Sequence, residues 1–371
     1  MTTLINPFFY ESPSDPASFT DRKEERERLS RMFEEHGRRI LLYGRRRMGK
    51  TSLIKNCVPA KSLLIYVDVS VAASMEELAK QLIHRSPRPD DAFLARALKI
   101  AAKHFKQVTL GAGGISIAGE LSDQTGPENL GQALNALNEL AADRDEVWTI
   151  CLDEFQEIQK LGGEKVDWKL RATIQEHRNL NYAFTGSDFR IVQWMTHPNS
   201  PFFKQLELME LGPITPALMG AWIDERARQG GSEGFIHGRE IVETAGPCTG
   251  DIVRLAKTVF FMTTQEMSAG VVEKAMEEIS NREHNGVFVG IWRELTVTQR
   301  LVLRAIANGD PPTASKTLRK QGIKAASSAH SAMVALVDRQ ILWQPSTGSQ
   351  AFENPFLKRW VATNGETSTA D

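Results

Sequence analysis

Residues 40–54 read ILLYGRRRMGKTSLI, an apolar run followed by a basic loop bounded by glycines and the start of a helix. Gly44, Gly49, Lys50 and Thr51 match the pattern G-x-x-x-x-G-K-[ST]. The glycines of this pattern let backbone N–H groups and the positive end of the following helix face phosphate oxygens. Its lysine bridges the β- and γ-phosphates, and its hydroxyl binds Mg²⁺. A strand before the loop and a helix after it favour a nucleotide site over a chance Gly-Lys turn.

The expected nucleotide-binding residues span the whole loop. They are Gly44, Arg45, Arg46, Arg47, Met48, Gly49, Lys50, Thr51 and Ser52, with Lys50 also expected to act in catalysis. The three loop arginines have three interpretations: contact with phosphate, contact with a neighbouring subunit, or simple exposure to solvent.

Short apolar runs alternate with helical patterns around the loop. The runs are 39–44, 62–69, 147–153, 181–186 and 206–211, and helices are expected at 75–84, 90–106, 128–142 and 165–178. Buried strands separated by helices are typical of a parallel sheet with both faces covered. The sequence therefore predicts an α/β fold with a three-layer αβα core. A hairpin or flap is expected at 108–121, and an amphipathic helix at 21–36 capped by Asp21.

Two carboxylates end the apolar run at 147–153. Asp153 and Glu154 suit a strand end that faces a ligand, because a protein core does not tolerate unpaired carboxylates. Asp153 is expected to bind Mg²⁺ together with Thr51, and Glu154 to polarise the attacking water as a general base. The alternative is a solvent-exposed acidic helix start.

A small polar residue follows the next run, 181–186. Ser187 is the candidate for a hydrogen bond to the attacking water or to the γ-phosphate, with Thr185 in reserve. A role for Ser187 as the N-cap of the following helix is an equal and compatible interpretation.

Helical patterns replace the strands beyond Pro213. The predicted domains are 1–212, an αβα core with an aromatic N-terminal arm; 213–290, a helical lid; 291–363, a winged helix-turn-helix; and 364–371, a frayed tail. The winged helix is expected from helices at 298–307, 313–321 and 325–339 followed by a hairpin at 341–354.

Charge is unevenly distributed along the chain. The whole sequence has a formal charge of −1, which gives no general case for a polyanion binder. Residues 295–363 hold nine basic and three acidic residues, a local charge of +6. The expected DNA contacts are Lys316, Arg319, Lys320 and Lys324, placed before a recognition helix that carries no arginine until its end. The alternative is that the winged helix serves as a protein-docking or autoinhibitory module.

Composition limits the class of protein further. The chain is 371 residues long with 41% hydrophobic and 25% charged residues, as in ordinary globular proteins. Cys57, Cys151 and Cys248 are too widely spaced for a disulfide framework or a CxxC metal cluster, so an intracellular, cytoplasmic protein is expected. No apolar run approaches the roughly 18 residues of a membrane span.

The combined motifs resemble a known family. NPFFY, FTDRKEERERL, LLYGRRRMGKTSLI, ICLDEFQEI, FTGSDF and SPFFKQLELMELGPI together resemble archaeal-type P-loop ATPases of the STAND class, AAA-like proteins related to the origin-recognition ATPases. The resemblance implies an AAA-like core, a helical lid and a winged helix. It also implies that FTDRKEE, and with it the aromatic arm at 8–19, covers adenine; with no guanine-reading Asn-Lys-x-Asp segment, ATP is the expected nucleotide.

The resemblance implies two further assignments. GDIVRLAK at 250–257 resembles the lid helix of the origin-recognition ATPases, which makes Arg254 a candidate sensor of the γ-phosphate; a solvated helix arginine is the alternative. Lys204 stands where relatives often have an arginine after SPFF. The sequence therefore leaves undecided whether a neighbour in a nucleotide-dependent oligomer supplies an arginine finger.

The sequence predicts an Mg²⁺-dependent ATPase that changes conformation with its ATP or ADP state. The second hypothesis is a slow or non-hydrolysing nucleotide-gated module whose output is DNA or a partner protein. A kinase is a third, for which the sequence offers no acceptor site.

Overall fold

The chain is described here from a computed structural model. It covers residues 5–11, 19–59, 62–86, 100, 108–111, 114–117, 126–162, 165–187, 189–265, 270–344 and 349–365. The chain forms two compact units. We call Asp15–Gly44 with Lys50–Gly212 the sheet unit, and Met1–Ser14 with Arg45–Gly49 and Pro213–Asp371 the helical unit.

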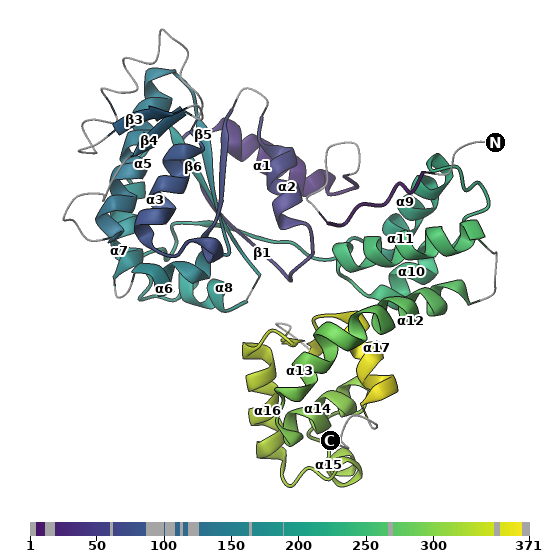
Figure 1. Cartoon of the computed structure of the whole chain (residues 1–371). Helices are drawn as coiled ribbons and strands as arrows, with labels where there is room; N and C mark the ends of the chain where they lie inside the picture. Colours follow the sequence, from purple (N-terminus) through teal and green to yellow (C-terminus); the bar gives the residue numbers. More distant parts are fainter. Residues whose placement is uncertain are drawn as a thin grey trace. The chain divides into compact units, whose positions relative to one another are not determined.

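The sheet unit is built on five parallel strands (Figure 1). They are β1 (Arg39–Tyr43), β2 (Leu64–Asp68), β5 (Trp148–Asp153), β6 (Leu180–Gly186) and β7 (Glu207–Glu210), in the order β2-β5-β6-β1-β7. Every residue of β5 and β6 is buried, as expected for central strands of a sheet covered on both faces. The predicted α/β class and all five strands are confirmed.

Helices cover the sheet. On one side lie α3 (Met75–His84), α5 (Gly126–Asp143) and α7 (Val166–Ile174), which pack on one another, while α1 (Lys23–Glu34) packs on α2 (Lys50–Cys57) (Figure 1). Short helical segments follow the strand ends: η1 (Val69–Val71), η2 (Phe155–Glu157), α6 (Ile158–Gly162) and α8 (Phe189–Thr196). One apolar core joins the central strands to α3, α5 and α7. It holds the carboxyl ends of the strands in fixed register.

Some local predictions need comment. The 108–121 segment contains the expected hairpin, β3 (Val108–Gly111) paired with β4 (Gly114–Ile117). The helix predicted at 90–106 and the tail at 364–371 lie largely outside the described residues. The cap assigned to Asp21 is wrong: the residue before α1 is Arg22, with a left-handed backbone and no side-chain cap.

The helical unit continues from Pro213. Its elements are α9 (Pro216–Gln229), α10 (Gly238–Ala245), α11 (Thr249–Gln265), α12 (Val271–Glu283), a π-helical turn η3 (His284–Phe288), α13 (Val289–Arg293), α14 (Val297–Ala307), α15 (Ser315–Gln321), α16 (Ala326–Asp338), β8 (Leu342–Trp343), β9 (Ala351–Phe352) and α17 (Pro355–Asn364). We call the β8–β9 hairpin and Glu353 the wing. The sequence analysis missed α17, which Asn354 caps by accepting hydrogen bonds from the backbone of Phe356 and Leu357.

The predicted lid and winged helix share one apolar core. Trp292 packs edge-on against Trp360 of α17, and α12 packs against α17. Residues 5–11, the described first part of the aromatic arm, group with this unit and not, as predicted, with the core domain: Phe8 is buried against Trp222 and Phe260. Apolar burial draws the arm there, and no Phe8 surface is left to cover a base.

Two findings concern cysteines and membranes. Cys57, Cys151 and Cys248 are free and buried, and burial raises the pKa of Cys57 and of Cys248 to about 12. Within the described ranges, no helix has the length and apolar character to cross a bilayer.

Candidate active site

The phosphate-loop motif follows β1 directly. Gly44 has φ +153°, and a Cβ there would lie 2.6 Å from the carbonyl oxygen of Leu211. Gly49 has φ +92°, in the region that favours glycine. Both glycines are therefore required by the backbone as well as by the sequence pattern.

Lys50 and Thr51 begin α2 beside the sheet. Lys50 is only 7% exposed, and its ammonium donates a hydrogen bond to the carbonyl of Gly44 at 2.8 Å. The Thr51 hydroxyl donates to Asp153 Oδ2 at 2.9 Å. The structure thus brings the predicted lysine, hydroxyl and carboxylate to one end of the sheet.

Asp153 is the centre of a hydroxyl cluster. It is 7% exposed, which excludes the solvent-exposed helix start. Besides Thr51, it accepts hydrogen bonds from Thr185, at the end of β6, and from Tyr66 on β2, the latter at 2.5 Å. Because β5 lies between β2 and β6, both neighbours reach the same carboxylate.

The cluster keeps Asp153 ionised. Burial by itself would raise its pKa, but the hydrogen bonds from Thr185, Tyr66 and Thr51, helped by the charge of Lys50, hold the pKa below its usual value. Burial and the hydrogen bond to Asp153 raise the pKa of Tyr66, which stays a neutral donor. Sequence reasoning missed Tyr66, and it kept Thr185 only in reserve.

Glu154 turns out of the strand next to this cluster. Its backbone is left-handed, at φ 50° and ψ 45°, a conformation uncommon for a residue with a side chain. Its carboxylate accepts hydrogen bonds from Ser187 Oγ at 2.8 Å and from Gln156 Nε2 at 2.5 Å. Ser187 thus contacts the predicted base itself, and Gln156 is a further residue that the sequence analysis did not single out.

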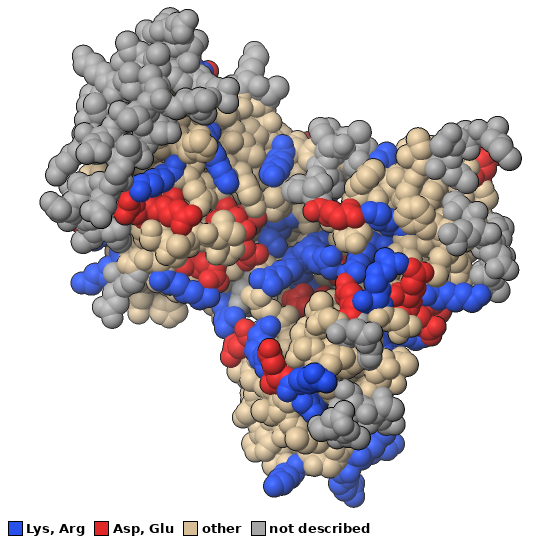
Figure 2. All heavy atoms as spheres, in the orientation of Figure 1, with Lys and Arg blue, Asp and Glu red and all other residues tan. Residues whose placement is uncertain are grey.

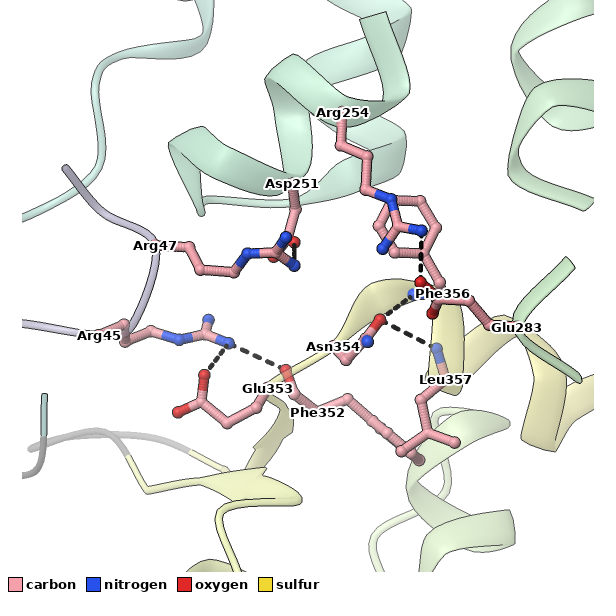
Figure 3. A network of polar contacts seen from close by, with 10 residues as sticks. All are labelled: Arg45, Arg47, Asp251, Arg254, Glu283, Phe352, Glu353, Asn354, Phe356 and Leu357. Atoms are coloured by element: carbon pink, nitrogen blue, oxygen red, sulfur yellow. Dashed lines mark hydrogen bonds and ion pairs between the residues drawn. The ribbon is translucent and has the colours of Figure 1, made fainter. Parts of the chain in front are cut away.

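The middle of the loop groups with the helical unit. Figure 3 shows Arg45 reaching the wing, where it donates to the carbonyl of Phe352 at 2.9 Å and lies 3.5 Å from Glu353. Arg47 pairs with Asp251, and the N–H of Gly250 donates to the Arg47 carbonyl.

The interpretation that the loop arginines are exposed to solvent is therefore wrong for Arg45, which is 8% exposed because the wing covers it. Arg46 is exposed and Met48 is buried.

Arg254 lies on α11 in the same unit. It pairs with Glu283 of α12, and its guanidinium lies 4.8 Å from the centre of the Phe356 ring (Figure 3). These contacts replace the solvated alternative, and the sensor role stays a prediction. Lys204 has a left-handed backbone, and its ammonium lies 5.2 Å from the Phe203 ring centre.

The four basic residues predicted to contact DNA lie on α15 or between α15 and α16. Lys316, Arg319 and Lys324 are exposed, while Lys320 pairs with Asp310 at 2.8 Å. On the face drawn in Figure 2, basic side chains project from the end of this region that carries α15. The polar side chains of α16 point outwards, and three of its serines, Ser327, Ser328 and Ser331, line a shallow hollow of about 430 Å³.

Comparisons with known proteins place the fold. The Walker-type ATPase Paby2304 of Pyrococcus abyssi superposes with a TM-score of 0.66 at 18% identity, covering 96% of this chain and 99% of that one. The ORC2 protein of Aeropyrum pernix, in a structure of its ADPNP–ADP complexes, gives 0.59 at 15% identity over 98% of both chains. A family model described as "Probable winged helix domain" matches residues 286–363.

The chain has the fold of a Walker-type ATPase with a C-terminal winged helix. No curated protein matches it in sequence. The winged-helix match begins five residues before the predicted boundary at 291, within the π-helical turn η3. In this chain the phosphate-loop motif begins at Gly44, directly after β1.

Proposed function

We propose that the chain is an Mg²⁺-dependent ATPase that acts as a nucleotide-driven conformational switch. One observation carries the proposal: Lys50, Thr51 and Asp153 meet at one end of the sheet, with Glu154 next in sequence. A lysine, a hydroxyl and two carboxylates at the end of a phosphate loop are the groups that phosphoryl transfer to water requires.

The residues present fit a magnesium ion. Mg²⁺ prefers oxygen ligands and binds through one or two protein groups plus phosphates and waters. The Thr51 hydroxyl and the Asp153 carboxylate are such ligands, 2.9 Å apart. When bound, the ion neutralises charge on the phosphates; Thr51 and Asp153 would hold it, and Lys50 would bind the phosphates beside it.

Glu154 is the proposed general base. Its backbone is left-handed, and hydrogen bonds from Ser187 and Gln156 hold its carboxylate. A carboxylate oriented in this way can accept a proton from an attacking water. Ser187 and Gln156 act as positioning residues in this proposal, and Arg254 as a candidate sensor.

The proposed partners are ATP and ADP at the loop and a second macromolecule at the winged helix. The +6 charge of residues 295–363 and the exposed Lys316, Arg319 and Lys324 favour DNA over a protein partner. A slow or non-hydrolysing switch with the same nucleotide site is the alternative, and steady-state turnover with and without DNA distinguishes the two.

Calorimetric titration with ATP and Mg²⁺ tests the nucleotide site. We expect wild type to bind in the micromolar range and Lys50→Ala to lose at least 10-fold in affinity, since a charge-assisted contact to phosphate is lost. Lys160→Ala, a surface lysine of the sheet unit, is the matched control and should bind like wild type. Equal affinities for wild type and Lys50→Ala would contradict the proposal.

A further inference from the structure

Asp68 lies beside Asp153 in the sheet unit. The two residues are paired across the parallel strands β2 and β5, at the last position of each strand. Because side chains alternate along a strand, residues paired in this way present their side chains on the same face of the sheet. Two like charges at such neighbouring positions repel each other. The sheet therefore ends in two adjacent carboxylates on one face.

The contacts of Tyr66 show which face this is. Tyr66 comes two residues before Asp68 on β2 and shares its face, and its hydroxyl reaches Asp153. Helix α2 covers that face. Its Thr51 donates to Asp153, and one turn later the Lys55 ammonium lies 4.7 Å from the centre of the Tyr66 ring. Asp68 thus lies on the face that carries the start of α2 and the proposed magnesium ligands.

The charge of Asp68 is not answered by a cation of the described chain. Its Oδ1 accepts hydrogen bonds from the backbone N–H and from the hydroxyl of Ser70, at 2.9 and 2.6 Å. Among the described residues Asp68 forms no ion pair, and none donates to its Oδ2. Asp68 is half-buried, so water screens its repulsion with Asp153 only in part. A pair of carboxylates in this setting favours a bound cation.

We infer that Asp68 is a second carboxylate of the magnesium site, a positioning residue that accepts hydrogen bonds from waters of the ion. The inference rests on the proposed function and deepens it, because it extends the site beyond Thr51 and Asp153. Mg²⁺ binds through one or two protein groups and keeps several waters. Groups that hold such outer positions contribute to metal affinity. Ser70 fixes the Asp68 carboxylate through Oδ1, which leaves Oδ2 as the acceptor.

Calorimetric titration of ATP into full-length Asp68→Asn, with Mg²⁺ and with EDTA in its place, tests the inference. The amide keeps an oxygen for Ser70 and replaces Oδ2 by an NH₂ donor. Outer partners of a metal ion typically contribute about 10- to 100-fold to its affinity, so the factor by which Mg²⁺ lowers the Kd of ATP should shrink about 10-fold. The Kd in EDTA should not rise, because the variant removes a negative charge from a site for a polyanion.

Asp167→Asn is the matched control. Asp167 lies in the first turn of α7 and, like Asp68, accepts a hydrogen bond from a nearby backbone N–H, that of Trp168 at 2.9 Å. Its Mg²⁺ factor should stay within about twofold of wild type, since it lies on another element than the proposed magnesium ligands. A wild-type factor in Asp68→Asn overturns the inference, as does an equal loss in Asp167→Asn.

Thermal unfolding without ATP or Mg²⁺ is the second measurement. Relief of the repulsion between Asp68 and Asp153 should raise the midpoint of Asp68→Asn by about 1–3 °C over wild type. ATP with Mg²⁺ should then raise the midpoint of the variant less than that of wild type. A variant that melts below wild type without ligand, and gains as much from ATP with Mg²⁺, has lost a structural contact only, which overturns the inference.

Wild type separates the two levels of the account. Wild type that binds no ATP, or binds it equally well with Mg²⁺ and with EDTA, overturns the proposed function and this inference together. Wild type that binds ATP more tightly with Mg²⁺, with the same Mg²⁺ factor in Asp68→Asn, overturns the role of Asp68 alone.

Discussion

The hydroxyl of Tyr66 on β2 donates a hydrogen bond to Asp153 Oδ2 at the end of β5, over 2.5 Å. The two strands are parallel neighbours, paired through Asp68 and Asp153. The hydroxyl therefore reaches the proposed metal ligand from the strand beside it, and it helps to hold the pKa of that carboxyl down.

Tyr66→Phe is expected to weaken Mg²⁺ dependence without unfolding the protein. A hydrogen bond to a charged group contributes about 1.5–3 kcal/mol, so we expect the Mg²⁺ concentration for half-maximal ATPase activity to rise about 10-fold. Tyr43→Phe is the control, because its hydroxyl lies 3.5 Å from Glu210 and away from Asp153. A Tyr66→Phe protein with the wild-type Mg²⁺ profile would argue against a role for this hydroxyl.

His177 is expected to make folding stability depend on pH. It is buried between the hydroxyl of Tyr182 and the amide oxygen of Asn135, and burial lowers its pKa from 6.5 to about 4. Below about pH 6.5 the unfolded chain binds a proton that the folded chain does not. The stabilising contribution is thus complete above pH 6.5 and is lost as the pH falls toward 4.

Urea unfolding at pH 7.5 and pH 5.0 measures this contribution. His177→Gln should lose less stability than wild type between the two pH values, by roughly 1–3 kcal/mol. His84→Gln, at an exposed position on α3, is the control and should follow wild type. Identical pH dependence in wild type and His177→Gln would show that this histidine does not titrate as its burial indicates.

Lys316 and Lys324 are expected to contact DNA phosphates if the winged helix binds DNA. Each phosphate contact contributes about 0.9 to the slope of log affinity against log salt, so Lys316→Ala combined with Lys324→Ala should reduce the slope by about 2. Fluorescence anisotropy with a labelled duplex at several salt concentrations measures it. The double variant Lys160→Ala and Lys169→Ala on the sheet unit is the control; a slope unaltered by the winged-helix changes would favour a protein partner.

Much of the fold could be predicted from local sequence patterns. The strand over 147–153 is a short apolar run. The glycines, lysine and threonine of the loop that follows the first strand have the spacing of a phosphate-binding loop, which few other structures share. Helix α17 was missed although Asn354-Pro355 is a good helix start, because the apolar runs before it indicated a hairpin alone.

The remaining features depend on tertiary contacts. In the sequence, Tyr66 is one residue of an apolar run and nothing marks it as a site residue. Only the pairing of β2 with β5 brings it to Asp153. The sequence pattern alone favours a solvent-exposed Arg45, because Glu353 lies 308 residues later in the chain and only the fold brings it to Arg45. Phe8 reads as part of the core domain, but the aromatic surface of Trp222 and Phe260 buries it in the helical unit.

Steady-state ATP turnover by Glu154→Gln tests the central claim most directly. A general base contributes about 10²- to 10⁴-fold, so we expect kcat to fall at least 100-fold while ATP affinity stays within a few-fold of wild type. Glu157→Gln, in the short helix η2 that directly follows Glu154, is the matched control; Glu157 pairs with Lys160, and the variant should turn over like wild type. Wild-type kcat in Glu154→Gln would contradict the account.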